Sequence, residues 1–333
     1  MRRKLFFLLA LLLLSGCSLL SSDKEEKYVP HNKTLKIALL LEGKKYDQGW
    51  DNQAYDGLKE IKRTMNAQTI YMQHVNTEQK QIAETKRLAE QGYELIFGNG
   101  RSFEKVFNQL APVYPNTQFV FFNGRSEVDN VSAINFTPES LGYFSGMVAA
   151  TMTKSKKVGL IPAYSSMNEI APFIRGVQDY NKKAKVMVRS VNSWNDGAKA
   201  VQIAQQMMEE GADILVPMGD GFNIDVIMEA HHKGRWAIGY ISDQSFVSKD
   251  TVITSTVQNV SDVYVKVAMQ HKEGTLPGGC VNYDFNNGGQ DLAGFGPMVP
   301  PFVQEQLEQK IKQYKTGEFS LPLPIHSVKC RGK

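Results

Sequence analysis

The sequence predicts an α/β protein with two doubly wound lobes, each built on a mainly parallel β-sheet. Short apolar runs alternate with segments of helical periodicity, and the alternation starts again after a polar break at 154–156. Repeated strand–helix units favour parallel sheets with right-handed crossovers. A chain of 333 residues is also long enough for two domains.

In the first half, short apolar runs predict strands and three- or four-residue apolar spacing predicts helices. The helix at 53–65, for example, carries Ala54, Leu58 and Ile61 on one face. The expected strands lie at 36–41, 69–72, 93–97, 118–122 and 131–136. The expected helices lie at 53–65, 78–90, 102–110 and 138–153.

The second half repeats the pattern. Gly211 follows the helix at 198–210, where a glycine is a favourable C-terminal stop. The expected strands lie at 157–161, 185–189, 213–217 and 236–240, with helices at 168–181, at 198–210 and between the last two strands.

The break at 154–156 sets the expected domain limits. The first lobe is expected to comprise 35–153 with 250–275, and the second 154–249 with 276–330. The chain would then cross between the lobes near Thr153, near 247–251 and near 274–278, and these crossings would form a hinge.

The N-terminus indicates export. Arg2-Arg3-Lys4 precedes an apolar run at 5–14, which is too short for an ordinary membrane span and is typical of a secretory signal. Leu14-Ser15-Gly16-Cys17 resembles a bacterial lipobox, which implies a signal peptide at 1–16 and a lipid on Cys17. The protein would then be anchored to the extracytoplasmic face of the cell membrane, with 17–34 as a flexible tether. The alternatives are a plain signal peptide with an incidental Cys17, or an uncleaved anchor.

Composition excludes several classes of function. Hydrophobic residues make up 42% of the chain, enough for ordinary cores. Removing Arg2, Arg3 and Lys4 from 38 basic residues leaves 35 against 34 acidic ones, so the near-neutral mature chain indicates no nucleic-acid partner. The sequence has no metal-ligand spacing, cofactor fingerprint or catalytic motif, so we expect neither a metal, nor a cofactor, nor an enzyme. Cys280 and Cys330 could form a disulfide bond or remain free thiols.

Parallel doubly wound sheets bind ligands beyond the carboxyl ends of their strands. We therefore expect a small-molecule cleft between the lobes. The loops that would line it are 42–52, 98–103, 123–127, 163–169, 192–197, 219–223 and 242–246.

Several of these loops resemble the basic membrane protein family, the lipoprotein solute receptors of ABC transporters, best known for nucleosides. The resemblance runs from about Lys36 to Thr316. It implies two Rossmann-like lobes of the type I periplasmic-binding-protein fold and an ABC permease or membrane sensor as partner. It is carried in order by Asp47-Gln48-Gly49-Trp50-Asp51-Asn52, Gly98-Asn99-Gly100-Arg101-Ser102-Phe103, Glu139-Ser140-Leu141-Gly142-Tyr143, Gly211-Ala212-Asp213-Ile214 and Ser242-Asp243-Gln244.

The resemblance also implies a ligand site. Trp50 and Trp194 fall at or near the positions of an aromatic clamp on a flat ligand, for which stacked rings are suited. The alternative is that each tryptophan anchors a loop on its own lobe. The polar candidates are Asp51, Asn99, Asn123, Asp220, Asp243 and Gln258, although Asp and Asn also favour Asx turns and helix caps.

Three positions depart from the family pattern. Ile241 stands where nucleoside receptors of the family have an Asp, Gln258 where they have a Lys, and Asn123 where they have another Asp. An isoleucine cannot accept a hydrogen bond from a ribose hydroxyl. The first hypothesis is a receptor for a small flat, nucleoside-like solute in uptake or sensing. The second is a regulatory lipoprotein of the same family that promotes competence gene expression through a membrane partner. Segments such as Gly219-Asp220-Gly221-Phe222-Asn223 carry that closer resemblance.

Overall fold

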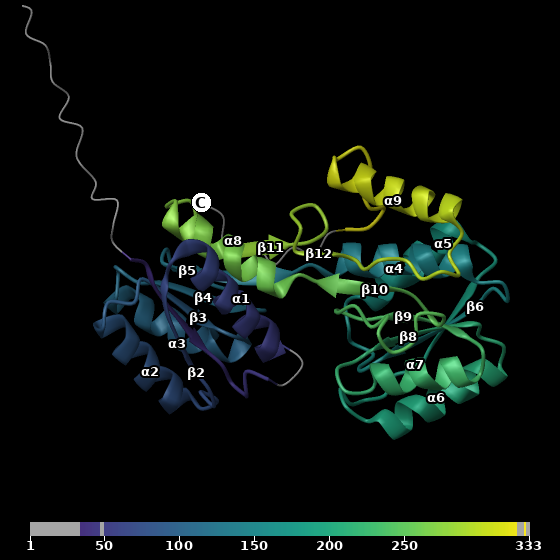
Figure 1. Ribbon diagram of the computed structural model, residues 1–333, viewed down its shortest axis with the longest axis horizontal. Coiled ribbons are helices and arrows are strands. Elements are labelled where there is room, and N and C mark those ends of the chain that lie inside the picture. The colour runs from purple at the N-terminus through teal and green to yellow at the C-terminus, as the bar shows by residue number, and fades with distance from the viewer. Residues whose placement is uncertain (1–33, 47–49, 325–329, 331–333) are drawn as a thin grey trace, which may run out of the picture. The chain divides into compact units, whose positions relative to one another are not determined.

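The computed structural model describes residues 34–46, 50–324 and 330. From Thr34 onward the chain forms one compact unit. It contains two six-stranded sheets with the strand orders β11-β5-β4-β3-β1-β2 and β12-β10-β9-β8-β6-β7 (Figure 1). We call the parts built on these sheets lobe 1 and lobe 2. The α/β class with two lobes, predicted from the sequence, is confirmed.

Lobe 1 has helices on both faces of a fully parallel sheet. One face packs on α1 and α8, and the other on α2 and α3. Strands covered on both faces need apolar residues on both sides, which explains their continuous apolar runs. The strands are β1 Lys36–Leu40, β2 Gln68–Met72, β3 Leu95–Gly98, β4 Gln118–Phe122, β5 Val131–Phe136 and β11 Gly279–Tyr283. The helices are α1 Trp50–Met65, α2 Glu78–Glu90, η1 Arg101–Phe103, α3 Glu104–Leu110, η2 Ala111–Val113 and α8 Val260–Lys272.

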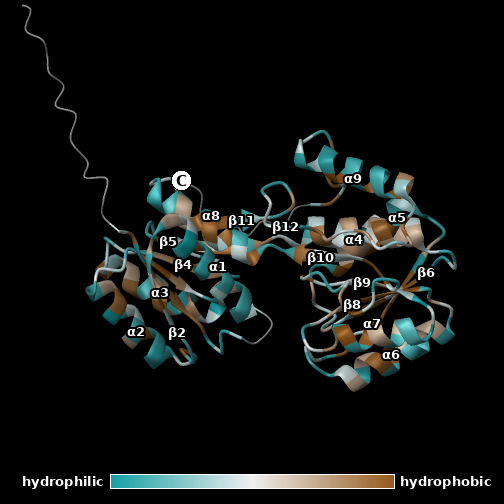
Figure 2. Cartoon of the chain, viewed as in Figure 1, coloured by the Kyte–Doolittle hydropathy of each residue, from teal (hydrophilic) through white to brown (hydrophobic). Residues whose placement is uncertain are grey.

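Lobe 2 repeats this plan, except that β12 runs antiparallel to β10 at the sheet edge. One face packs on α4, α5 and α9, and the other on α6 and α7. Figure 2 shows hydrophobic residues gathered in the strands and both kinds of residue on covering helices such as α9. The strands are β6 Lys157–Pro162, β7 Lys185–Val188, β8 Ile214–Met218, β9 Trp236–Gly239, β10 Val252–Gln258 and β12 Gln290–Leu292. The helices are α4 Pro138–Met152, α5 Ile170–Tyr180, α6 Gly197–Glu209, α7 Asn223–His232 and α9 Pro301–Lys315.

The domain limits differ from the sequence-based expectation. The chain leaves the first sheet after β5, returns after β10 and leaves again after β11. Lobe 1 therefore comprises 34–136 with 260–283, and lobe 2 comprises 138–258 with 290–324. The expected crossings near Thr153, 247–251 and 274–278 were wrong, because α4 and β10 belong to lobe 2 and β11 belongs to lobe 1.

Glycines explain why α4 belongs to lobe 2. A Cβ atom on Gly146 would lie 2.2 Å from the carbonyl oxygen of Phe173, and one on Gly176 would lie 2.1 Å from that of Tyr143. The backbones of α4 and α5 thus touch directly, which only glycine permits. The polar break at 154–156 is a turn within lobe 2, where the Asp213 carboxylate accepts hydrogen bonds from the backbone N–H groups of Lys154 and Ser155 at 2.6 and 2.7 Å.

The crossing segments are hydrogen-bonded to one another. The Thr137 N–H donates to the carbonyl oxygen of Tyr283 at 2.9 Å. The Asn259 N–H donates to that of Gly289 at 2.9 Å, and its side-chain amide donates to that of Gly288 at 3.0 Å. A relative movement of the lobes would have to bend these paired segments together.

Two further expectations concern the termini. Cys280 and Cys330 form a disulfide bond, with their Cα atoms 5.3 Å apart, which settles the alternative that the sequence left open. Cys17 and the expected signal and tether lie outside the described residues. No helix among the described residues is long and apolar enough to cross a membrane.

Candidate functional site

The structure brings the four candidate residues of lobe 1 to one edge of its sheet. Trp50 and Asp51 open α1, which follows β1, while Asn99 follows β3 and Asn123 follows β4. Because these strands are parallel, all four residues lie at the carboxyl edge, where ligands bind in open α/β sheets.

Asp51 and Asn99 belong to a buried hydrogen-bond network. The Asn99 amide nitrogen donates to Asp51 Oδ1 at 2.6 Å, and the Gly43 N–H donates to Asp51 Oδ2 at 2.7 Å. The Tyr264 hydroxyl donates to Asn99 Oδ1 at 2.8 Å. Asp51 and Asn99 are 6% and 2% exposed, so their observed contacts hold the β1–α1 loop against β3 and α8.

Trp50 rests on the aromatic end of the lobe 1 sheet. Its ring meets Phe122 and Phe136 edge-on, with centroids 5.7 and 6.1 Å away. Edge-to-face contacts of this kind stabilise a ring position beyond simple area burial. Trp50 is only partly buried, so the Phe122 and Phe136 contacts fix its orientation while part of it remains accessible.

Asn123 lies in the left-handed region of backbone space, with φ of 63°. Asparagine tolerates this conformation better than most residues, which fits a sharp turn after β4. Its N–H donates to the carbonyl oxygen of Ile134 at 2.8 Å, and the residue is exposed.

A tyrosine cluster that the sequence analysis missed flanks this edge. The Lys45 ammonium lies 4.6–4.9 Å from the ring centroids of Tyr46, Tyr55 and Tyr71. It also donates to the Tyr71 hydroxyl at 2.6 Å, and this bond is the main cause of a raised Lys45 pKa. Such cation–π contacts hold Lys45 against α1 and β2. Aromatic residues spread over 46–71 gave no periodic signal that could have revealed the cluster.

The candidate residues of lobe 2 also follow the carboxyl ends of their strands. Trp194 is 39% exposed, and its ring lies 5.7 Å from that of Tyr164, at 65°. The Trp194 carbonyl oxygen accepts hydrogen bonds from the N–H groups of Asp220 and Gly221 at 3.1 and 3.0 Å. The loops after β6, β7 and β8 are therefore linked around one accessible tryptophan.

The β9–β10 end of lobe 2 carries the remaining candidates. Asp243 is exposed, and its carboxylate accepts from the Ser245 N–H at 2.9 Å, an Asx turn. Gln258 ends β10, and its N–H donates to the Ile241 carbonyl oxygen at 3.1 Å. Ile241 has φ of 56°, an unfavourable conformation for a β-branched residue. A second hydrogen bond holds it there, from its own N–H to Thr256 Oγ1 at 3.0 Å.

Glu169 and Tyr240 form a polar pair at this edge that the sequence analysis did not single out. The Tyr240 hydroxyl donates to Glu169 Oε1 at 3.3 Å. Burial raises the Glu169 pKa, although the Tyr240 hydrogen bond opposes the shift, and Glu139 raises it further. Burial also raises the Tyr240 pKa. A charged residue inside the apolar stretch at 167–173 was the signal available in the sequence.

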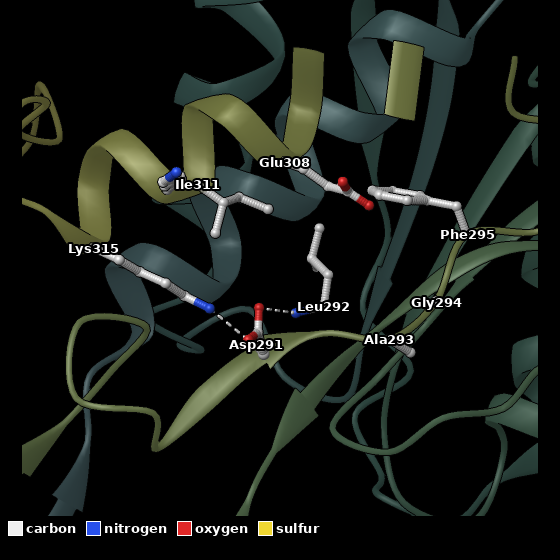
Figure 3. A pocket seen from close by; sticks show the side chains of 9 residues that line it. Asp291, Leu292, Ala293, Gly294, Phe295, Glu308, Ile311 and Lys315 are labelled. Carbon is white, nitrogen blue, oxygen red and sulfur yellow. Dashed lines mark hydrogen bonds and ion pairs between the residues drawn. The ribbon is translucent and has the colours of Figure 1, made fainter. Parts of the chain in front are cut away.

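Two pockets lie within single lobes, away from these residues. One, of about 330 Å³, lies between α9 and the segment from Asp291 to Phe295 in lobe 2, where Lys315 pairs with Asp291 (Figure 3). The other lies between α1 and α8 in lobe 1. None of the eight candidate residues lines either pocket. Among the described residues, no group of three or more His, Cys, Asp or Glu side chains could hold a metal ion.

Comparison with protein families gives one match. Residues 34–320 match the family described as Bmp, ABC transporter substrate-binding protein PnrA-like. The two lobes have the fold of solved ABC transporter solute-binding proteins, that is, the type I periplasmic-binding-protein fold.

The relatives of this chain include proteins named as transcriptional activators and proteins named for purine or nucleoside binding. The chain is 37% identical to "Transcriptional activator protein med" of Bacillus subtilis, over 92% of this chain and 95% of that protein. It is 27% identical to a purine-binding protein of Brucella abortus, covering 86% and 82% of the two chains. It is also 27% identical to the nucleoside-binding protein BmpA of Lactococcus lactis, covering 84% and 86%. A solved structure described as a transcriptional activator of the comK gene from Bacillus halodurans superimposes with a TM-score of 0.81 at 36% identity, covering 86% of this chain and all of that one.

Proposed function

This chain belongs to the Bmp family of PnrA-like ABC transporter substrate-binding proteins, and from that premise we propose that it is a lipid-anchored receptor for a small flat solute. The solute, nucleoside-like in shape and polarity, would bind between the carboxyl edges of the two sheets. The observation that carries the proposal is that each lobe presents one partly accessible tryptophan at that edge, Trp50 and Trp194.

The surrounding contacts support a preorganised site. The Asp51–Asn99–Tyr264 network holds the start of α1, which carries Trp50, and Lys45 packs against Tyr55 of the same helix. The Trp194 carbonyl oxygen holds the β8–α7 loop. A ligand that touches both lobes would favour the closed form by its higher affinity for that form. Asn123, Asp220, Asp243 and Gln258 are the polar groups we propose around such a ligand. Asp51 and Asn99 would act mainly by positioning Trp50.

Lipid on Cys17 would hold the receptor at the extracytoplasmic face of the membrane. An ABC permease or a membrane sensor would then recognise the closed lobes. Relatives named for purine and nucleoside binding support a heteroaromatic solute. The Ile241 side chain packs on the lobe 2 core and offers no hydrogen-bond acceptor. It therefore favours a ligand without a hydroxyl group at that position, such as a purine base that lacks ribose.

The test is calorimetry and thermal shift on residues 18–333 with purine bases, nucleosides and other flat solutes. We expect binding that Trp50→Leu and Trp194→Leu each abolish. Trp236→Leu is the matched control, because Trp236 begins β9 at the amino edge of the sheet. A folded protein that binds nothing in the panel, or that loses binding equally in all three variants, would overturn the proposal.

A second function is favoured by the relatives named as transcriptional activators, which share 36–37% identity with this chain. It is a regulatory lipoprotein that promotes competence gene expression through a membrane partner. A deletion strain complemented with Trp50→Leu separates the two functions. Regulation through ligand sensing would be lost with binding, whereas a ligand-independent regulator would keep its effect.

A further inference from the structure

The C-terminal segment connects the two lobes by a route that the three chain crossings do not use. After α9, Leu321 is 7% exposed within the lobe 2 core, and Phe319 lies 6.0 Å from the ring of Tyr143. Nine residues beyond Leu321, Cys330 is bonded to Cys280 in β11, the edge strand of lobe 1. One end of this segment is therefore held by lobe 2 and the other is held covalently by lobe 1.

The lobe 1 end is well seated. The Ser126 N–H donates to Cys330 Sγ at 3.3 Å, and a Cβ atom on Gly279 would lie 3.8 Å from Cys330 Cβ. Ser126 is itself fixed, since its hydroxyl donates to Asn108 Oδ1 at 2.5 Å. Cys280 packs against the lobe 1 core that α2 and α3 cover. A force on Cys330 would therefore be transmitted to lobe 1 through the disulfide bond.

We propose that the Cys280–Cys330 disulfide bond is a fourth connection between the lobes, one that limits how far they can separate. Six residue steps join Pro324, the last residue of the lobe 2 end, to Cys330. A fully extended chain of that length reaches about 20 Å. The three chain crossings would act as a hinge about which the lobes rotate apart. The disulfide-bonded segment would stop this rotation once it is fully extended. By removing the widest conformations, the tether shifts the population toward closed ones.

The experiment compares lobe separation in four proteins without any ligand, so its outcome is independent of the receptor proposal. They are residues 18–333 of the wild type, Cys280→Ser, the Cys280→Ser/Cys330→Ser double variant, and an insertion variant. The insertion places about twenty Gly and Ser residues between Pro324 and Ile325, which adds roughly 25 Å of slack and leaves both cysteines intact. Small-angle X-ray scattering measures the distribution of interatomic distances, and circular dichroism with thermal unfolding checks folding.

We expect the serine variants and the insertion variant to show the same shift toward longer distances and a larger radius of gyration. If the serine variants do not fold, the insertion variant carries the test alone. An insertion variant with the wild-type distance distribution would overturn the proposal, because the disulfide bond would then act only on lobe 1 stability. A broadened insertion variant beside unchanged serine variants would overturn it equally.

Discussion

The Tyr264 hydroxyl donates a 2.8 Å hydrogen bond to Asn99 Oδ1, although the two residues are 165 positions apart in the chain. Tyr264 comes from α8, which joins lobe 1 only after the chain has built most of lobe 2. The bond fixes the amide so that its nitrogen faces Asp51, the second residue of α1 and the neighbour of Trp50. The position of Trp50 therefore depends on a late segment of the sequence.

Removing this hydroxyl should destabilise the protein. Tyr264 is fully buried, so Tyr264→Phe leaves Asn99 Oδ1 without its donor. We expect a loss of about 1–3 kcal/mol in the free energy of unfolding, measured by urea denaturation. Tyr114→Phe is the control, because its bond to Glu90 is at the surface and should contribute less than about 1 kcal/mol. Equal losses in the free energy of unfolding would show that the buried Tyr264 bond contributes no more than the surface bond of Tyr114.

Glu169 should make stability depend on pH. Its pKa is raised by folding, so between the ordinary glutamate value of about 4.3 and the raised value the folded protein binds more protons than the unfolded one. The free energy of unfolding must then fall as pH rises through this window, and the loss persists above it. Glu169→Gln should remove that fall, so its stability relative to wild type increases with pH in denaturation series. Glu305→Gln, at an exposed position on α9, is the control and should run parallel to the wild type.

The contact of α4 with α5 should tolerate no side chain at its glycines. Gly146→Ala places a methyl group against the Phe173 backbone, where neither helix can yield without moving the other. We expect destabilisation of about 1–3 kcal/mol, measured by chemical denaturation. Gly294→Ala meets nothing within 4 Å and should leave stability nearly unchanged. A neutral Gly146→Ala would show that the helices are less closely packed than the structure has them.

Ile241 should accept asparagine with little loss of stability. A left-handed conformation costs a β-branched residue about 1–3 kcal/mol, and asparagine relieves most of that cost. This relief should offset the lost apolar contacts to within about 1 kcal/mol in equilibrium unfolding. Ile238→Asn, in the buried strand β9 that precedes Ile241, should cost more than about 3 kcal/mol. Comparable losses at both positions would show that Ile241 is held without strain.

Cys17 should determine whether the protein is attached to the membrane. With Cys17→Ser, no lipid can be attached, and we expect the protein to move from the membrane fraction to the medium or the soluble fraction. Immunoblots of fractionated cells measure this directly, with Cys280→Ser as a control that leaves the attachment site intact. Retention of Cys17→Ser in the membrane would favour an uncleaved anchor.

The sequence predicted the regular elements up to residue 240 because their periodicity is local. It placed no element between 240 and the C-terminus, where β10, α8, β11, β12 and α9 alternate less regularly. It also predicted α4 as a helix and assigned it to the wrong lobe, because periodicity does not record which sheet a helix covers. The Gly146–Phe173 contact that decides this is visible only in three dimensions.

For the candidate site, the sequence predicted where the residues lie but not which residues they contact. Trp50, Asn99 and Trp194 each lie in a segment that follows a predicted strand. In a parallel sheet such segments lie at the carboxyl edge, so this placement could be predicted from the sequence. The partners of these residues come from distant segments, as Tyr264 shows for Asn99. The Glu169–Tyr240 pair joins loops after different strands and leaves no spacing signature.

The order of segments along the chain has a consequence for folding. Lobe 1 is begun first and finished late, because α8 and β11 follow every lobe 2 strand except β12. Until those residues are synthesised, one face of the lobe 1 sheet lacks Val263, Tyr264 and Val267, which complete its core. A nascent chain that stops short of residue 283 therefore has an unfinished first domain and exposes apolar surface. If the chain is exported in the unfolded state, as its N-terminal sequence predicts, this delay would keep premature folding from competing with export.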